Sequence, residues 1–486
     1  MRTGSAGRVG GCGARAEGRV EPLAVLRGLP AEPEVRAPRA AGAPERVRGV
    51  VRVAMVLTVA AHPPGQGYAV PCPGTSVRFA RRRGPTRRVR APWQGRGMTT
   101  STRTRPGPGA AAPVTRAAVL RHRVRVQQLD RPAGSAAGPT DADVLAVGVQ
   151  DTGPDGSLWA LAVRGVPVRA GAFPEELALA WTLRGAPHLY RRADLPSVQR
   201  ALRPFSDDDA ARRVLDASRP WRAAGLRPLD AWARVAAAQR ALVREPVVKG
   251  ELSTLLTAEL GEPYTRWCRP CGATHLYEQS FRLPALHAGL ELVPGTSPPV
   301  LRPVPGWPPE QVGQVERADD EPDGEHDVVR LLLHLLGPMT PKQAAELLDA
   351  PLADVRRRWP SDAVEVEVDG RRSGALPADA AALQVHEDVA DEPLVRLLGP
   401  YDLYLQGRDR DLLVPDAARR KALWPVLGRP GAVLVDGEVV GTWRPRTRGR
   451  RLGLELDPWV PWDAATTAGV EREHARLAAF RGLSAG

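Results

Sequence analysis

Two cysteines and one histidine lie close together in the order Cys268, Cys271 and His275. Thiolate sulfur and imidazole nitrogen are favoured ligands of Zn²⁺, and a two-residue gap between cysteines is common in zinc sites. A structural zinc site needs four ligands, and only Glu278 or His287 lies near enough in the sequence to supply the fourth. We therefore expect a metal-free pair of thiols in a turn and keep zinc binding as the alternative.

The segment LADVRRRW contains three consecutive arginines, Arg356, Arg357 and Arg358. In a helix-turn-helix protein the recognition helix enters the major groove of DNA, and basic side chains around it contact phosphates. We predict that these arginines and Lys342 contact DNA. The alternatives are that this module binds protein, or that the arginines form a solvated helix face.

The elements that must position these arginines have the pattern of a helix-turn-helix with a wing. VVRLLLHLLG predicts a helix that a Gly-Pro pair ends. Thr340 and Gln343 are the N-cap and N3 residues of a capping box that begins the next helix, PKQAAELLD. LADVRRRW is the third helix, and Asp369-Gly370 is the turn of a following hairpin.

A basic hairpin is also expected nearer the N-terminus, where ELALAWTLRG and APHLYRR predict two strands. Basic side chains interleaved with an aromatic ring suit phosphate contact and base stacking. The DNA-contact candidates of this hairpin are Arg184, His188, Tyr190, Arg191 and Arg192. The alternative for His188 and Tyr190 is a place in the core of the strand.

The last hundred residues change to a strand-like pattern with a closing helix, GVEREHARLAAFRG. Further candidates for phosphate contact line the last predicted hairpin: Arg444, Arg446, Arg448, Arg450 and Arg451. A second charged group contains Asp402, Arg408, Asp409 and Arg410. For that group we expect a buried ion-pair network rather than DNA contact.

The net charge of +13 looks at first like the signature of a nucleic-acid-binding protein. Residues 1–97 hold 18 of the 68 basic residues but only 5 of the 55 acidic ones, so residues 98–486 are balanced. DNA binding by the remainder must therefore come from local patches. The first segment is aperiodic and rich in Gly, Pro, Ala and Arg; we favour an upstream stretch before a true start at Met98, over a basic tail or a signal sequence.

Bulk composition excludes several classes of protein. Hydrophobic residues make up 43% of the chain, but no run approaches the roughly 18–20 apolar residues of a membrane span. Only Cys268 and Cys271 lie outside the first segment, which suits a reducing, cytoplasmic compartment. No Walker, Rossmann, HExxH or serine-hydrolase pattern is present.

The predicted fold class is α+β, with tandem winged-helix units followed by a small antiparallel β-barrel. The expected organisation is an N-terminal extension, a first unit with the candidate catalytic motif, a second unit, a linker, a third unit, and a β-barrel with its closing helix. The corresponding ranges are 1–113, 114–245, 246–305, 306–326, 327–390 and 391–486.

Several strings together resemble the winged-helix DNA-binding family that contains the AlkZ-like alkylpurine DNA glycosylases. They are VLAVGVQDTGPDGSLWALAVRG, WTLRGAPHLYRRADLP, VVRLLLHLLGPMTPKQAAELL, LLGPYDLYLQGRDRDLLVP and GAVLVDGEVVGTWR. The match runs from about Val114 to the C-terminus. The resemblance implies three winged helices and a β-barrel around a concave cleft for duplex DNA, and excision of alkylated purines, including those in interstrand crosslinks.

The family's catalytic signature is Gln, an apolar residue, then Gln or Asp. The corresponding positions here are Gln150, Asp151 and Thr152. Only the first member is kept. A Gln amide can orient a water molecule as both donor and acceptor, and a carboxylate can act as a base or stabilise positive charge. We expect a helix from Thr140 that ends at Gln150; alternatively, Asp151 caps the following turn and Thr152 bonds to backbone.

Two functions follow from these observations. The first is a monofunctional DNA glycosylase that hydrolyses the N-glycosidic bond of alkylated purines in duplex DNA, a DNA-repair hydrolase. The second is a non-catalytic winged-helix DNA-binding protein, either a regulator or a damage-binding scaffold. For both we expect a monomer that binds double-stranded DNA, with no membrane partner, no cofactor and no metal.

Overall fold

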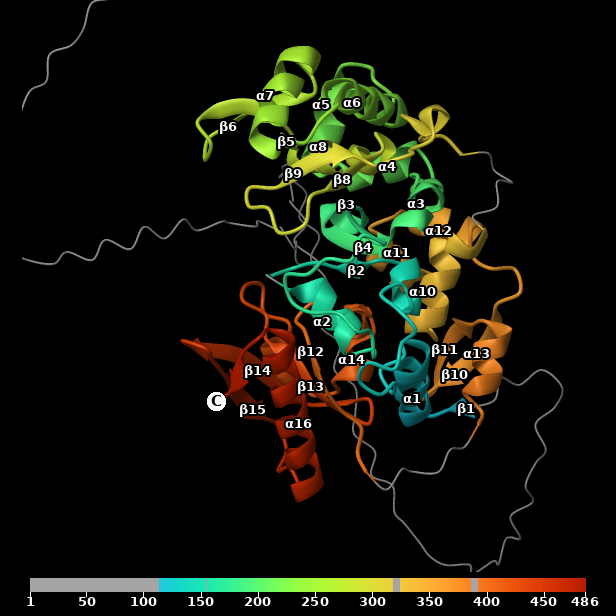
Figure 1. Cartoon of the computed structure of the whole chain (residues 1–486). Coiled ribbons are helices and arrows are strands. Elements are labelled where there is room, and N and C mark those ends of the chain that lie inside the picture. Colours follow the sequence, from blue (N-terminus) through green and yellow to red (C-terminus); the bar gives the residue numbers. More distant parts are fainter. Residues whose placement is uncertain (1–112, 154, 318–323, 386–391) are drawn as a thin grey trace, which may run out of the picture. The chain divides into compact units, whose positions relative to one another are not determined.

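The computed structural model describes residues 113–153, 155–317, 324–385 and 392–486, all within one compact unit (Figure 1). The predicted extension therefore lies almost entirely outside the described residues. Among the helices of the described ranges, none is long and apolar enough to cross a membrane.

A six-stranded antiparallel sheet organises the first part of the described chain. Its strands in spatial order are β2 (Val149–Gln150), β4 (Pro187–Arg191), β3 (Leu177–Trp181), β8 (Leu290–Leu292), β9 (Val300–Pro303) and β5 (Val247–Val248). The predicted hairpin is present as β3 and β4, whose residues pair from Leu177–Arg191 to Trp181–Pro187. Strands from both sides of residue 245 share this sheet, and β2 forms one edge of it.

Short helices make up most of the remaining regular structure in this part of the chain. They are α1 (Arg116–Val126), α2 (Gly156–Ala162), α3 (Leu195–Ala201), α4 (Asp207–Arg213), α5 (Ser218–Ala223), α6 (Pro228–Leu242), α7 (Lys249–Leu260), α8 (Glu278–Arg282) and α9 (Pro284–His287). A separate two-stranded hairpin, β6 (Thr265–Cys268) and β7 (Ala273–Leu276), lies between α7 and α8 in the sequence.

The prediction of a helix from Thr140 to Gln150 is wrong. The chain instead forms one 3-10 turn, Asp143–Ala146, and then enters β2. Gly148 causes the change because it has a left-handed backbone (φ 89°), and a Cβ atom there would lie 2.4 Å from the ring of Tyr190. The close approach of β4 therefore overrides the local helix signal.

Three helices and a hairpin occupy residues 328–375 where the sequence predicts them. They are α10 (Val328–Leu336), α11 (Pro341–Leu348), α12 (Leu352–Arg357), β10 (Val364–Val368) and β11 (Arg371–Ala375). The capping box of Thr340 and Gln343 is present at the start of α11. The two-residue strand β1 (Pro113–Val114) pairs in parallel with β10, so the start of the described chain completes this group; α13 (Pro377–Ala382) follows it.

The C-terminal part is a curled, half-barrel sheet rather than the closed small barrel that the sequence suggests. Its order is β12 (Val395–Leu398), β13 (Gly431–Val435), β14 (Glu438–Arg448), β15 (Arg451–Pro458) and β16 (Ser484–Ala485), with β12 and β16 at opposite edges. The short helices α14 (Arg410–Leu413) and α15 (Ala417–Leu423) connect β12 to β13. The closing helix α16 (Ala464–Phe480) packs along β12 (Figure 1).

Two buried ion pairs join the N-terminal helices to the C-terminal part. Arg164, just after α2, donates two hydrogen bonds of 2.8 Å to Asp402, and both side chains are completely buried. Arg123 of α1 is paired with Asp409 at 2.5 Å. The expected ion-pair network around Asp402 and Asp409 therefore exists, but its cations come from distant segments and not from the neighbouring Arg408 and Arg410.

Candidate active site

Gln150 is the last residue of edge strand β2, where it pairs with His188 of β4. Its amide Nε2 donates a hydrogen bond of 2.9 Å to Oγ1 of Thr152. Both side chains are half-buried, so they are ordered by the protein and still reach its surface. Among the described residues, Oε1 of Gln150 has no hydrogen-bond donor and the Thr152 hydroxyl has no acceptor. Oε1 can therefore accept a hydrogen bond from water, and the hydroxyl can donate one.

Asp151 points away from this pair and holds the start of α2. Its backbone N–H donates to the carbonyl of Pro187 at 2.8 Å. Its Oδ1 accepts from the backbone N–H of Ser157 at 3.1 Å and from the Ser157 hydroxyl at 2.7 Å. The alternative role expected from the sequence, a cap on the following turn, is therefore what Oδ1 of Asp151 performs here.

The carboxyl group of Asp151 has a raised pKa. Burial is the main cause, and the nearby carboxylate of Asp155 adds to it, while the hydrogen bonds from Ser157 act in the opposite direction. Asp155 itself forms an ion pair of 2.7 Å with Arg481, the residue that follows α16. The loop between β2 and α2 is thus fixed at both ends, by β4 and by the C-terminal helix.

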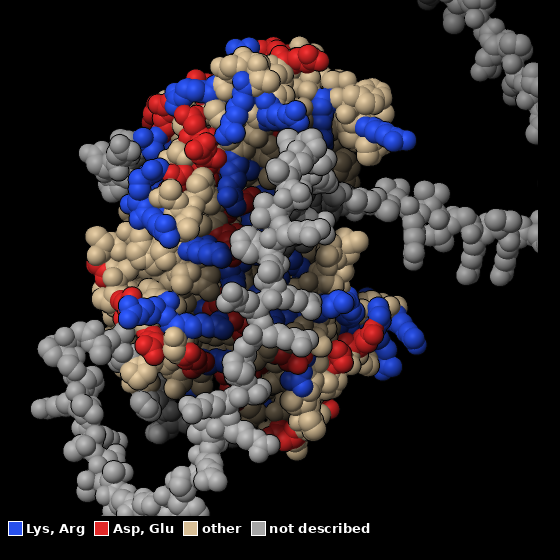
Figure 2. Space-filling view, turned by 180° about the vertical axis from the view of Figure 1, so that it is seen from behind, with Lys and Arg blue, Asp and Glu red and all other residues tan. Residues whose placement is uncertain are grey.

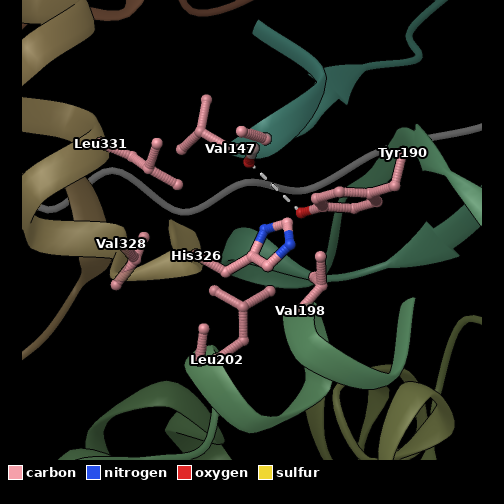
Figure 3. Close-up of a pocket in the computed structure, with 9 residues that line it drawn as sticks. Val147, Tyr190, Val198, Leu202, His326, Val328 and Leu331 are labelled. Atoms are coloured by element: carbon pink, nitrogen blue, oxygen red, sulfur yellow. Dashed lines mark hydrogen bonds between the residues drawn. The ribbon is translucent and has the colours of Figure 1, made fainter. Parts of the chain in front are cut away.

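Tyr190 and His188 of the predicted basic hairpin are buried in the core, which is the alternative role that the sequence left open for them. The Tyr190 hydroxyl receives a hydrogen bond from Thr182 at 2.9 Å and donates one to the carbonyl of Val147 (Figure 3). Burial lowers the pKa of His188 to about 4, so its ring is neutral at physiological pH.

The two arginines that follow are structural. Arg191 donates from Nε to the carbonyl of Thr140 and from Nη2 to the carbonyl of Ala142, at 2.8 Å each. Arg192 forms an ion pair of 2.5 Å with Glu291, whose side chain is completely buried. Both guanidinium groups are therefore engaged in positioning the sheet, which opposes the predicted phosphate contacts.

The arginine triplet is divided between the surface and the protein interior. Arg356 and Arg357 are exposed in the last turn of α12, and Arg357 is paired with Asp354. Arg358 is half-buried, with its guanidinium 5.0 Å from the centre of the Phe205 ring. Lys342 is exposed on α11, 4.0 Å from Glu346. Of the triplet, only Arg356 and Arg357 are placed to meet a ligand.

The arginines of β14 alternate with other residues and share one face of the strand. Arg444 is half-buried and donates to the carbonyl of Gly428 at 2.7 Å. Arg446 is exposed and paired with Glu455 of β15. Arg448 is exposed at the end of the hairpin.

A group of four arginines, which we call the arginine cluster, comes from three separate segments: Arg184, Arg408, Arg410 and Arg429. Burial is the main cause of the lowered pKa of Arg184, Arg408 and Arg410, and repulsion by other members of the cluster adds to it. Asp349 acts in the opposite direction on Arg184, and Glu346 does so on Arg408, whose pKa nevertheless falls to about 10. The Nε atoms of the cluster, except that of Arg184, are buried and have no hydrogen-bond partner among the described residues. No carboxylate of the described ranges forms an ion pair with any member.

One member of the arginine cluster, Arg184, lies near the strand pair that carries Gln150. Arg184 is in the link between β3 and β4, and its charge affects His188, the β4 partner of Gln150. Arg410 stacks on Trp424, with its guanidinium 4.9 Å from the ring centre, and Arg429 stacks on Tyr401 at 5.1 Å. Of these arginines, the sequence predicted a DNA contact only for Arg184. Arg408 and Arg410 were expected in ion pairs, and no local pattern marks Arg429.

Figure 2 shows one face of the molecule, on which basic side chains run close together from its upper part to its middle among fewer acidic ones. Because residues 98–486 carry no net charge overall, they can attract DNA only through local groups of basic side chains such as this one.

Two cavities in the described part of the chain are small. The one in Figure 3 is about 10 Å³ and is lined mainly by apolar side chains around His326 and Tyr190. The other is about 20 Å³ and includes Arg184 and His287 in its walls. Each is comparable to a single water molecule, so neither holds a purine base.

Comparison with known proteins matched a family model and found solved structures similar to the chain. The model of a family described as DNA glycosylase AlkZ-like matches residues 142–480, more than two thirds of the chain. The structure of Streptomyces sahachiroi DNA glycosylase AlkZ is similar with a TM-score of 0.55 and 20% sequence identity, over 77% of this chain and 100% of that one. That likeness shows a shared fold. No curated protein matched the chain.

Proposed function

The chain belongs to the AlkZ-like DNA glycosylase family, and on that premise we propose that it removes alkylated purines from duplex DNA. In this reaction the oxygen of water bonds to C1′ of the sugar and the bond from C1′ to the purine nitrogen breaks. The alkylated base leaves as a neutral molecule, and the proton that water loses is released to solvent. A purine alkylated at N3 or N7 is cationic and therefore leaves without prior protonation. The protein must position the water and stabilise the positive charge that develops on the sugar.

The observation that carries this proposal is the Gln150–Thr152 pair, because it lies within the family match and leaves water-binding groups free. Gln150 Oε1 accepts a hydrogen bond from the attacking water and so orients it. The hydrogen bond to Thr152 limits the rotation of the Gln150 amide. Thr152 occupies the third position of the family signature, where the family has Gln or Asp. Its hydroxyl acts on the reaction only through its hydrogen bond with Gln150. Its role is that of a positioning residue.

Asp151 has one carboxylate oxygen for a second role. Oδ1 is occupied by Ser157, whereas Oδ2 has no hydrogen-bond partner among the described residues. The ionised carboxylate would stabilise positive charge on the sugar, and it could accept the proton that water loses. We propose the electrostatic role first, because a group fixed by two hydrogen bonds from Ser157 is poorly placed to move with a proton.

The arginine cluster is proposed to bind the DNA backbone beside the reacting nucleotide. The four cations form no ion pair among the described residues, and Asp349 and Glu346 offset only part of their repulsion. A phosphate placed among them would relieve the rest. Arg356, Arg357 and Lys342 would add contacts from α11 and α12, and Arg446 and Arg448 from β14. In this proposal the group 327–390 acts as a winged-helix unit, and the ranges 114–245 and 246–305 as two further such units. The monomer acts on duplex DNA.

The test is to incubate the full chain with duplex DNA that contains N7-methylguanine and then cleave abasic sites with alkali. Strand breaks at the modified base that depend on the protein would support the proposal. Tight binding without base release would instead favour a damage-binding protein, which the use of Asp151 Oδ1 as a cap would also fit.

A further inference from the structure

The hairpin β6–β7 brings the three candidate metal ligands together at its turn. Cys268 is the last residue of β6, Cys271 lies in the turn, and His275 is on β7 opposite Arg266. The two sulfur atoms and a ring nitrogen of His275 all lie within 4.8 Å of one another. Three ligand atoms bound to one Zn²⁺ ion at about 2.0–2.3 Å would be separated by distances of this order.

The orientation of His275 is that of a metal-binding histidine. Its Nδ1 is 2.6 Å from the carbonyl oxygen of Leu276. Because a carbonyl can only accept, Nδ1 carries the proton, and Nε2 of the neutral ring keeps its lone pair. That Nε2 atom is buried and has no hydrogen-bond partner among the described residues. A backbone carbonyl that fixes the tautomer in this way is the usual support of a metal-bound histidine.

The two residues that sequence analysis considered for the fourth position are both engaged elsewhere. His287 is buried in the core, where Nδ1 is 2.8 Å from Gln199 and the ring meets Trp232 edge-on at 5.7 Å. Glu278 is paired with Lys249 at 2.7 Å and with Arg282 at 2.5 Å. Cys271 is exposed, so the side of the cluster next to it is open to water.

We propose that Cys268, Cys271 and His275 bind one Zn²⁺ ion, with water in the fourth position. This inference is independent of the glycosylase activity proposed above. Binding converts two thiols to thiolates, and the two protons go to solvent, so that the site gains no net charge. The ion would tie the turn 269–272 to both strands of the hairpin, at an end where Trp267 is 66% exposed.

The first experiment measures the zinc content of the full chain, purified without added metal and with reductant present. We expect one zinc per chain, and loss of that zinc in His275→Ala and in Cys268→Ser. Thr274→Ala, an exposed position on the same strand, is the matched control and should keep it. Wild-type protein without zinc, or equal zinc in all four proteins, would overturn the proposal.

The second experiment does not depend on the variants folding. Zinc is removed from the wild-type chain with a chelator and replaced with Co²⁺, which gives a sulfur-to-metal charge-transfer absorption when thiolates bind it. We expect this absorption to saturate at one Co²⁺ per chain and the melting temperature to recover with it. Absence of the absorption, or a Cys268–Cys271 disulfide found in freshly purified protein, would contradict the proposal.

Discussion

The Gln150 amide donates a hydrogen bond of 2.9 Å to the Thr152 hydroxyl, across the residue whose side chain holds the start of α2. Alternate side chains along this short segment therefore point in different directions. Gln150 and Thr152 form one polar pair, and Asp151 anchors the helix that follows. The division explains how a chain that keeps only the first member of the family's catalytic signature can retain a fixed, half-buried amide.

Asp151→Asn should slow base excision at neutral pH and flatten its dependence on pH. The pKa of Asp151 lies above its ordinary value of 3.8, so in the wild type the carboxylate is protonated, and excision slows, as the pH falls through that raised value. The asparagine side chain keeps the shape and cannot ionise. Single-turnover excision rates, corrected for spontaneous release of the alkylated base, test this. An unchanged pH profile in Asp151→Asn would leave Asp151 with a purely structural role.

Replacing Arg408 and Arg410 by Ala should weaken binding to duplex DNA and reduce its salt dependence. For every phosphate that the variant no longer neutralises, the slope of log K against log salt should fall by about 0.9. Because these arginines repel each other in the free protein, the melting temperature should stay the same or rise. Arg222→Ala, an exposed arginine paired with Asp208, is the control and should change neither quantity. A large fall in melting temperature with unchanged DNA affinity would mark the cluster as structural.

Asp402→Ala should destabilise the protein strongly. It would leave Arg164 buried without its anion, which costs on the order of 3–5 kcal/mol. Equilibrium urea unfolding measures the change, and Asp208→Ala, on an exposed pair, is the matched control. Similar unfolding midpoints for the two variants would show that the buried pair contributes little.

The wild-type protein should lose stability between pH 6.5 and about 4. Burial lowers the pKa of His188 to about 4 and that of His287 to about 3, so the unfolded chain binds protons in this range that the folded chain does not. Each histidine then stabilises the fold fully above pH 6.5 and loses that contribution as the pH falls. Melting temperatures of the wild type and His188→Gln across this range test the idea; the variant should show the smaller loss, and parallel curves would contradict it.

Local signals predicted much of the fold. Residues adjacent in the sequence determine three of the correctly predicted features: the capping box at Thr340, the Asp-Gly turn after β10 and the closing helix α16. The failures are long-range. Gln150 lies on a strand because Tyr190 packs against Gly148, and Arg192 is engaged by Glu291, about a hundred residues away.

The candidate site was harder to predict than the fold for the same reason. Gln150 came from a motif, whereas Arg429 joins the arginine cluster only through tertiary structure. Closeness in the sequence also gave the wrong ion-pair partner. Arg408 and Arg410 follow Asp402 closely, but the buried partner of Asp402 is Arg164, 238 residues earlier.

The central claim is that Gln150 acts on the water and not on the DNA. Its most direct test compares Gln150→Ala with the wild type on the same N7-methylguanine duplex, measuring both the single-turnover excision rate and the dissociation constant. We predict that excision falls on the order of 10²-fold or more while affinity stays within a few-fold, because the amide contributes mainly in the transition state. Equal losses in rate and affinity, or an undiminished rate, would contradict the account.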